Sequence, residues 1–303
     1  VIPHSPKIYL EDIYAFDSHF VISQRQNALT ELVVYERPKA GGISKTNSEN
    51  KKFAATKLKK TAIVFKDEAY VASFGANAEY QTDKFRYEYE SMSQPPTTYD
   101  YDLRKSKSVV VREKIVPNYD AKKYKTLRLF APARDGEKIP ISVLVKKNFQ
   151  PEGKNPLYVY AYGSYGISME PSFDRSTISL VDRGFAHAIL HIRGGSEKGR
   201  EWYENGKLLK KKNTFNDFID ATEFLVKKGY GQKGRVYAMG GSAGGLLMGA
   251  IYNMRPDLYN GIIAAVPFVD IVTTMLDDTI PLTTFEYDEW GNPNDKKFYK
   301  YMK

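Results

Sequence analysis

The sequence of 303 residues contains no cysteine, which excludes several classes of protein. Disulfide scaffolds, thiolate zinc sites, iron–sulfur clusters and cysteine nucleophiles all need that side chain. Histidine is scarce, with 4 residues, and no apolar run approaches the roughly 18 residues that span a bilayer. The chain begins without a methionine or the apolar core of a signal peptide, so we expect a processed or cut N-terminus. The cytoplasm and the periplasm fit these features equally.

The overall composition is that of a globular protein, with 42% hydrophobic and 27% charged residues. Lysine and arginine number 45 against 36 aspartate and glutamate residues, and the resulting charge of +9 suggests a polyanionic partner. However, seven of the basic residues lie in a Gly/Ser/Asn-rich stretch, residues 39–60, which is typical of a solvated loop. We therefore expect no nucleic-acid partner and no membrane partner.

Residues 1–113 have the pattern of an all-β region. Short aromatic and β-branched runs alternate with turn residues, and their four-strand rhythm fits two blades of a β-propeller. A segment at 93–98, which contains Pro95 and Pro96, interrupts this rhythm, and we expect it to be a connector.

Residues 114–303 change to alternating strands and helices. The pattern predicts a hairpin over 127–145, buried strands at 157–162, 186–192, 236–239 and 262–266, and helices at 214–228 and 243–253. This alternation is typical of an α/β fold with a mostly parallel sheet, helices on both faces, and a site at the carboxyl ends of the strands.

A glycine-rich serine turn, Gly240-Gly241-Ser242-Ala243-Gly244-Gly245, joins one predicted strand to the following helix. A sharp strand–turn–helix connection strains the serine backbone and needs neighbours with almost no side chain. Ser242 Oγ would stand at the end of the strand, and the backbone N–H of Ala243 would point at a developing oxyanion. A helix start that only packs tightly or binds phosphate is the alternative, but the context favours a nucleophilic serine.

Several motifs in a fixed order resemble those of the prolyl oligopeptidase family of serine peptidases, and within it those of oligopeptidase B. They comprise the segments 91–103, 133–140, 160–166, 192–195, 202–207 and 211–217, the serine turn, and Glu289-Trp290-Gly291-Asn292-Pro293. The resemblance implies a partial α/β-hydrolase domain at 114–303, preceded at 1–113 by the last blades of a seven-bladed propeller.

The resemblance also implies roles for individual residues. Tyr162 matches the second oxyanion donor, and a phenol at a strand end beside the nucleophile can donate a hydrogen bond to a tetrahedral oxyanion. Tyr165 matches an aromatic residue that lines the substrate pocket. Glu286 and Asp288 match acids that bind the basic residue before the scissile bond in oligopeptidase B, whereas prolyl oligopeptidases have a tryptophan at the place of Glu286. Phe285 departs from the glycine common there, which leaves the pocket's width open.

The local charge also indicates a basic substrate. Between Arg255 and Lys296 the sequence has eight carboxylates and no lysine or arginine, against the sign of the whole chain. A solvated acidic loop would explain this run, but a desolvated Arg or Lys side chain also needs a carboxylate partner. We expect a cofactor-independent serine oligopeptidase that cleaves short peptides after Arg or Lys through an acyl-enzyme, with cleavage after proline as the alternative.

Three polar residues near predicted strand ends have competing explanations. Arg193, followed by two glycines, would assist substrate binding or simply form a turn. His187 and His191 lie four residues apart on a predicted strand, and this spacing brings ligands together on a helix but not on a strand. We therefore expect no metal site.

The general base of a serine hydrolase is missing from the pattern. Hydrolases of this fold supply the triad in the order Ser, Asp, His, but all four histidines precede Ser242. We therefore expect an internal fragment that lacks the triad Asp and His and is nearly inactive alone. A base supplied out of order by His187 or His191 and a non-catalytic propeller–hydrolase module are the alternatives.

Overall fold

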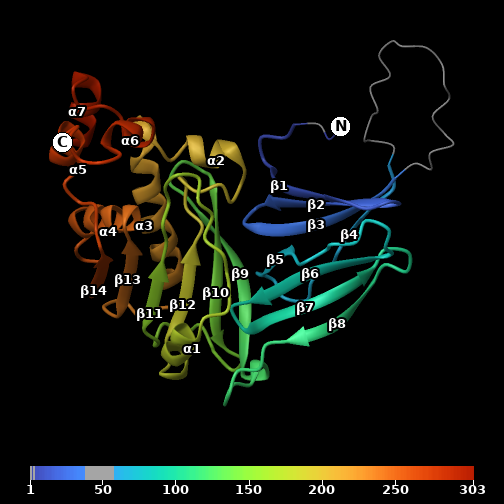
Figure 1. Cartoon of the computed structure of the whole chain (residues 1–303). Helices are drawn as coiled ribbons and strands as arrows, with labels where there is room; N and C mark the ends of the chain where they lie inside the picture. Colours follow the sequence, from blue (N-terminus) through green and yellow to red (C-terminus); the bar gives the residue numbers. More distant parts are fainter. Residues whose placement is uncertain (1, 3, 38–57) are drawn as a thin grey trace, which may run out of the picture.

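The computed structural model describes all residues except 1, 3 and 38–57, so most of the predicted loop at 39–60 lies outside the described residues. The N-terminal part of the chain forms two four-stranded antiparallel sheets (Figure 1). The first consists of β1 (Tyr9–Ala15), β2 (His19–Gln26), β3 (Leu29–Glu36) and β4 (Lys60–Ala62). The second consists of β5 (Val71–Phe74), β6 (Lys84–Ser91), β7 (Gln94–Asp102) and β8 (Lys107–Glu113). In both sheets the strands follow their sequence order, as in propeller blades.

An aromatic core joins the two sheets. Every second residue of β6 is buried, which is the period that places side chains on one face of a strand. Phe85 of β6 meets Phe16, which follows β1, edge to face at a centroid distance of 6.1 Å. Tyr87 and Tyr89 of β6 are buried in the same cluster. The aromatic runs of the sequence therefore form the contact between the blades.

Residues 94–98 belong to strand β7, and only Ser93 lies in the turn before it, so the prediction of a connector at 93–98 is wrong. The pairing register of β6 and β7 shifts between Tyr89 and Ser91, which pair with Thr97 and Gln94. Pro95 and Pro96 lie at this bulge, where the ladder needs no backbone donor from them. The two prolines led to the prediction of a break at this point, but the strand continues through them.

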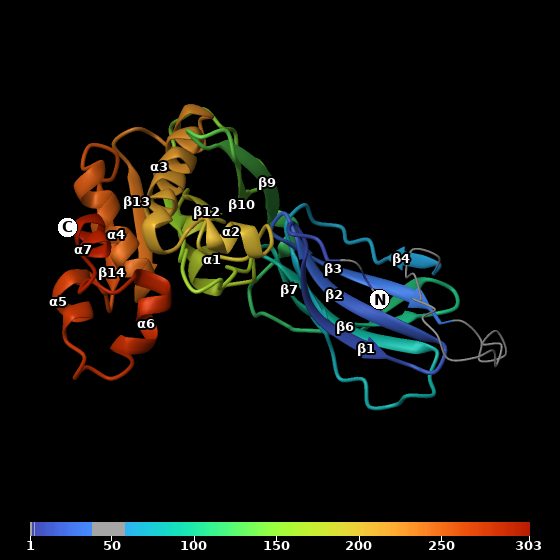
Figure 2. The same ribbon diagram turned by 90° about the horizontal axis from the view of Figure 1, so that it is seen from above.

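The C-terminal part of the chain is built on a six-stranded sheet in the order β14-β13-β11-β12-β10-β9. The strands are β9 (Tyr124–Pro132), β10 (Lys138–Lys146), β11 (Leu157–Tyr160), β12 (Ala186–Leu190), β13 (Val236–Gly241) and β14 (Gly261–Ala265). β9 and β10 form the predicted hairpin, and β11 to β14 pair in parallel with one another. Figure 2 shows the blades beside the β9 edge of this sheet.

Helices cover both faces of the six-stranded sheet. α1 (Arg175–Asp182) packs on one face, against Leu144 of β10 and Ile189 of β12. α3 (Lys212–Lys227) and α4 (Ala243–Met254) pack on the other face, where the neighbouring strand residues Val143 and Ala188 point. The alternation along each strand thus separates two apolar clusters.

The remaining helices gather around the carboxyl ends of the parallel strands (Figure 1). They are α2 (Arg200–Glu204), α5 (Ile271–Leu276), α6 (Thr283–Trp290) and α7 (Lys296–Met302), with short 3₁₀ turns η3 (Ala121–Lys123) and η4 (Leu208–Lys210) elsewhere in the chain. Among the helices that the structure describes, none is long and apolar enough to cross a membrane. Three of the eight acids in the run, Glu286, Asp288 and Glu289, lie on α6, and Asp270 and Asp277 flank α5, so the run does not form one solvated loop.

Candidate active site

Ser242 occupies the sharp turn between β13 and α4. Its backbone has φ 55° and ψ −117°, a conformation that costs an L-residue free energy and is found mostly at functional sites. Its side chain is exposed and makes no hydrogen bond to the first turn of α4, although Ser242 stands at the N-cap position. The turn therefore presents a hydroxyl that is not used for capping.

Close backbone approaches explain the glycines around this serine. A Cβ atom on Gly240 would lie 2.2 Å from the carbonyl oxygen of Gly244, and one on Gly245 would lie 2.5 Å from Cα of Pro267. At Gly241 the nearest atom would be 3.6 Å away, an ordinary contact. Gly240 and Gly245 are thus required by the geometry, whereas Gly241 is not.

Two hydrogen-bond donors lie beside Ser242. Ala243 is the first residue of α4, so its backbone N–H has no acceptor within the helix. Tyr162 follows β11, which pairs in parallel with β13, and its ring packs in the same apolar cluster as Ala243. Burial raises the pKa of Tyr162, while a hydrogen bond from the Ser242 side chain lowers it in part. The phenol therefore stays protonated and can donate at neutral pH.

Tyr165 connects the loop after β11 to helix α6. Its hydroxyl donates to Oε2 of Glu286 at 2.7 Å, and Nε1 of Trp290 donates to the same oxygen at 2.8 Å. Burial and the hydrogen bond to Glu286 raise the pKa of Tyr165. The rings of Tyr162 and Tyr165 lie 6.3 Å apart, centroid to centroid. Tyr165 therefore lies between the half-buried carboxylate of Glu286 and the ring of Tyr162.

Asp288 does not join Glu286 at this point. The two acids are two positions apart on α6, and a helix turns by about 200° over that distance. Asp288 is exposed, whereas Glu286 is half-buried. Of the two predicted acids, the structure brings Glu286 to Tyr165 and leaves Asp288 on a different side of the helix.

Four other acids of the run between Arg255 and Lys296 have local structural roles. Asp257 pairs with the Arg255 guanidinium at 2.8 Å. Asp270 and Asp295 accept from backbone N–H groups at the starts of α5 and α7, and Asp277 accepts from Thr279. Helix caps and turns favour carboxylates for this reason. Half of the charge excess thus reflects local structure rather than substrate selection.

Arg193 is buried and its donors are occupied, which supports the structural explanation over substrate binding. Its Nε and Nη2 donate to the two carboxylate oxygens of Asp217 at 2.8 and 2.5 Å, and Nη1 donates to Asp135 at 2.5 Å. The bidentate pair with Asp217 joins the segment after β12 to α3, and the contact with Asp135 joins it to the β9–β10 hairpin. We therefore do not retain Arg193 as a substrate ligand.

The histidines are engaged away from Ser242. His187 stacks on Tyr158, and His191 makes a 2.8 Å hydrogen bond with the Ser142 hydroxyl. Burial lowers the pKa of His187 to about 4 and that of His191 to about 3, so both are neutral. His19 is the first residue of β2, and His4 lies in the segment before β1. In the part of the chain that the structure describes, no group of three or more potential metal ligands occurs.

Two buried charged residues near the site were missed by the sequence reasoning. Lys211 lies between η4 and α3, Glu289 lies on α6, and both contact the loop at 163–166. Both residues fall in segments that resemble the family, 211–217 and Glu289–Pro293, but Lys211 is one of three consecutive lysines and Glu289 is one of eight acids, so no role was predicted for either. The helical period of 283–290 would have been the one signal that Glu286 and Glu289 share a face.

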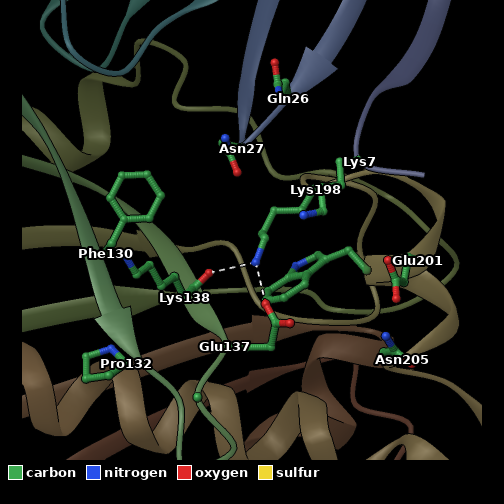
Figure 3. A pocket seen from close by; sticks show the side chains of 12 residues that line it. Lys7, Gln26, Asn27, Phe130, Pro132, Glu137, Lys138, Lys198, Glu201 and Asn205 are labelled. Carbon is green, nitrogen blue, oxygen red and sulfur yellow. Dashed lines mark hydrogen bonds and ion pairs between the residues drawn. The ribbon is translucent and has the colours of Figure 1, made fainter. Parts of the chain in front are cut away.

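A cavity of about 740 Å³ lies between the first blade and the six-stranded sheet, away from the predicted site (Figure 3). Asn27 lines it from the blade, and Phe130 and Lys198 line it from the other side. Lys198 Nζ is held by Glu137 at 2.7 Å and by the Lys138 carbonyl at 3.2 Å. None of the predicted site residues lines this cavity, so the site is defined by the Ser242 turn and not by this opening.

Two family models match the chain. Residues 1–114 match the "Prolyl oligopeptidase, N-terminal beta-propeller domain", and residues 171–303 match the "Prolyl oligopeptidase family". The predicted fold class, an α/β-hydrolase domain preceded by propeller blades, is thereby confirmed.

Individual relatives agree with these matches. The chain is 47% identical to dipeptidyl aminopeptidase BI of Pseudoxanthomonas mexicana over 99% of its own length and 39% of that protein. It is 36% identical to protease 2 of Moraxella lacunata, covering 100% of this chain and 41% of the relative. The structure of oligopeptidase B from Leishmania major superposes with a TM-score of 0.86 at 40% identity, over 99% of this chain and 41% of that one. The chain thus spans about two fifths of the length of these relatives.

Proposed function

The chain belongs to the prolyl oligopeptidase family of serine peptidases, and we propose that it carries the nucleophile and the substrate-selecting acid of an oligopeptidase that cleaves short peptides after Arg or Lys. The observation that carries this proposal is the grouping of Ser242, Tyr162 and the Tyr165–Glu286 pair at the ends of two adjacent parallel strands. This is the edge of an α/β sheet where such sites are built.

In the proposed reaction, Ser242 Oγ attacks the scissile carbonyl and forms an acyl-enzyme with release of the amine. The negative charge that develops on the carbonyl oxygen is stabilised by the N–H of Ala243 and the hydroxyl of Tyr162. Water then hydrolyses the acyl-enzyme and restores the serine.

A general base must remove the Ser242 proton. His187 and His191 are buried and neutral and have other partners, so a base supplied out of order is disfavoured. We propose that a histidine and its orienting aspartate come from another part of the full-length gene product, in the order usual for this fold.

Substrate selection rests on Glu286. Its carboxylate accepts from two neutral donors, Tyr165 and Trp290, so neither of these contacts supplies the positive charge that a guanidinium or an ammonium would bring. Asp288 is exposed and would add a second, solvent-screened charge at the mouth of the site. Tyr165 would contribute the apolar wall against which an Arg stem packs.

We also propose a division of the chain into propeller blades at 1–113 and the beginning of the hydrolase domain at 114–303. Buried contacts cross this boundary: Arg25 of β2 pairs with Glu170 beyond β11, and Ala28 N–H donates to the Glu197 carbonyl at 2.6 Å. A propeller held against the site in this way would admit short peptides and exclude folded proteins.

The test is a panel of matched peptide amides with Arg, Lys, citrulline or Pro before the scissile bond, hydrolysed by the full-length gene product. We expect kcat/KM to be highest for Arg and Lys, and Ser242→Ala to abolish turnover. Highest activity on Pro would favour the alternative specificity, and no turnover of any peptide would favour a non-catalytic module. Because one relative is named a dipeptidyl aminopeptidase, each peptide is offered with a free and with a blocked amino terminus.

A further inference from the structure

A buried ion pair contacts the loop at 163–166, which follows Tyr162 and contains Tyr165. Lys211 is 5% exposed and Glu289 is 3% exposed, and Lys211 Nζ lies 3.8 Å from Glu289 Oε1. Lys211 comes from the junction of η4 and α3, and Glu289 comes from α6. Two elements that are far apart in the sequence thus place opposite charges at one point.

Both members of the pair hold the loop at 163–166. Lys211 Nζ donates to the Gly163 carbonyl at 2.6 Å and to the Ser164 hydroxyl at 2.7 Å. Glu289 Oε1 accepts from the backbone N–H of Tyr165 at 3.0 Å, and Oε2 accepts from the Tyr203 hydroxyl at 2.7 Å.

The loop needs such support because its backbone is unusual. Gly163, Tyr165 and Gly166 have φ values of 73°, 59° and 69°, and the left-handed region is unfavourable for a tyrosine. The loop follows Tyr162 directly and contains Tyr165, so its position sets both the oxyanion donor and the partner of Glu286.

Stability does not account for the pair. Burying two charges costs several kcal/mol, and an apolar pair of similar volume is often as stable or more stable. The neighbouring Trp290 ring, 4.9 Å from Lys211 Nζ, shows that apolar groups fit in this region. What an apolar pair could not supply is the set of directed hydrogen bonds to the loop.

We propose that Lys211 and Glu289 are positioning residues that fix the loop at 163–166, so that Tyr162 meets the oxyanion and Tyr165 holds Glu286. This role rests on the function proposed above. It adds to that function two residues that touch no reacting atom.

The pair also has a pH signature. Burial lowers the pKa of Lys211 to about 8, and the negative charge of Glu289 opposes that shift. Loss of the Lys211 proton weakens the loop contacts, so kcat/KM should fall as the pH rises through about 8. The other groups facing Lys211 are Trp290, Gly163 and Ser164, which do not titrate, and Tyr203 reaches it only through Glu289.

Stability should change in the opposite direction. An unfolded lysine has a pKa near 10.4, so between about pH 8 and 10 the unfolded chain binds more protons at Lys211 than the folded chain. The contribution of this residue to the free energy of unfolding therefore rises with pH in that window. If the pair only stabilised the fold, the activity of the protein would not fall over the pH range in which its stability rises.

The experiment compares three variants of the full-length gene product on the peptide amide that the wild type cleaves best. The double variant Lys211→Met/Glu289→Gln removes both charges without leaving one unpaired. Glu289→Gln alone keeps the acceptor for Tyr165 but removes the charge that holds the Lys211 proton. Lys212→Met is the matched control, because Lys212 is the next residue, is exposed, and places its ammonium over the Tyr301 ring, away from the loop at 163–166 in the part of the chain that the structure describes.

We expect the double variant to stay folded and to lose about 10- to 100-fold in kcat, as small displacements of catalytic groups do. Glu289→Gln should move the alkaline limb of kcat/KM to lower pH, and Lys212→Met should stay within about twofold of the wild type. The proposal is overturned if the double variant matches the Lys212→Met control, or if the alkaline limb is the same in Glu289→Gln and the wild type. A wild type that prefers another residue to Arg would contradict the proposed specificity without affecting this comparison.

Discussion

Replacing Glu286 with glutamine should separate recognition of charge from recognition of shape. Glutamine has nearly the same size, and its carbonyl oxygen can still accept from Tyr165 and Trp290, so the local fold should persist. Only the negative charge is removed.

The size of the effect follows from the half-buried position of Glu286. A hydrogen bond to a charged group contributes about 1.5–3 kcal/mol, and partial exposure of this carboxylate favours the lower part of that range. A loss of about 2 kcal/mol corresponds to a roughly 30-fold lower kcat/KM for an Arg peptide amide.

The matched control is the substrate in which citrulline replaces Arg, because citrulline has the same length without the charge. Its kcat/KM should change by less than about threefold in Glu286→Gln, as expected when no charge contact is lost. An equal loss on both substrates would show that Glu286 acts through the fold of the site, and no loss on Arg would show that it does not bind the substrate.

Three further predictions concern the turn, the oxyanion donor and acid stability. Tyr162→Phe should lower kcat by about 100- to 1,000-fold with little change in KM, and steady-state kinetics on the Arg amide would refute a donor role if kcat were unchanged. Gly240→Ala should lower the midpoint temperature of unfolding, because the alanine Cβ would lie 2.2 Å from the Gly244 carbonyl oxygen. Gly241→Ala is the control and should leave the midpoint unchanged, because its Cβ would lie 3.6 Å from the nearest atom. Equal midpoints for the two variants would contradict this prediction. Because the pKa of His187 is lowered to about 4 by burial, the unfolded state binds more protons between about pH 6.5 and 4, and stability falls as the pH falls through that window. In His187→Gln the free energy of unfolding, measured by urea titration at several pH values, should fall by about 3 kcal/mol less over this window than in the wild type. The same pH dependence in the variant and the wild type would contradict this prediction.

The elements of the hydrolase part were predictable because their signals are local. The strand before Ser242 is apolar, the turn is made of small residues, and the helix after it is apolar almost all round. These features depend on a few consecutive residues, so the strand, the turn and the helix could be assigned without any tertiary information.

The features that could not be predicted depend on tertiary contacts, which no local rule describes. Pro95 and Pro96 lie within a strand because a bulge removes the need for their backbone donors. The acids at 283–290 lie on a helix, and which of them faces Tyr165 depends on helix phase rather than on the charge count. The pairing of Lys211 with Glu289 joins residues 78 positions apart, and no single-sequence pattern reports such a contact.

The most direct test of the account is covalent labelling of the full-length gene product with a diphenyl phosphonate whose side chain is that of arginine. Such a reagent phosphonylates the activated serine, and mass spectrometry of the digested protein locates the adduct. The account predicts one adduct on Ser242, formed faster than with the proline phosphonate and lost in Ser242→Ala. An adduct on another residue, or faster reaction with the proline reagent, would contradict it.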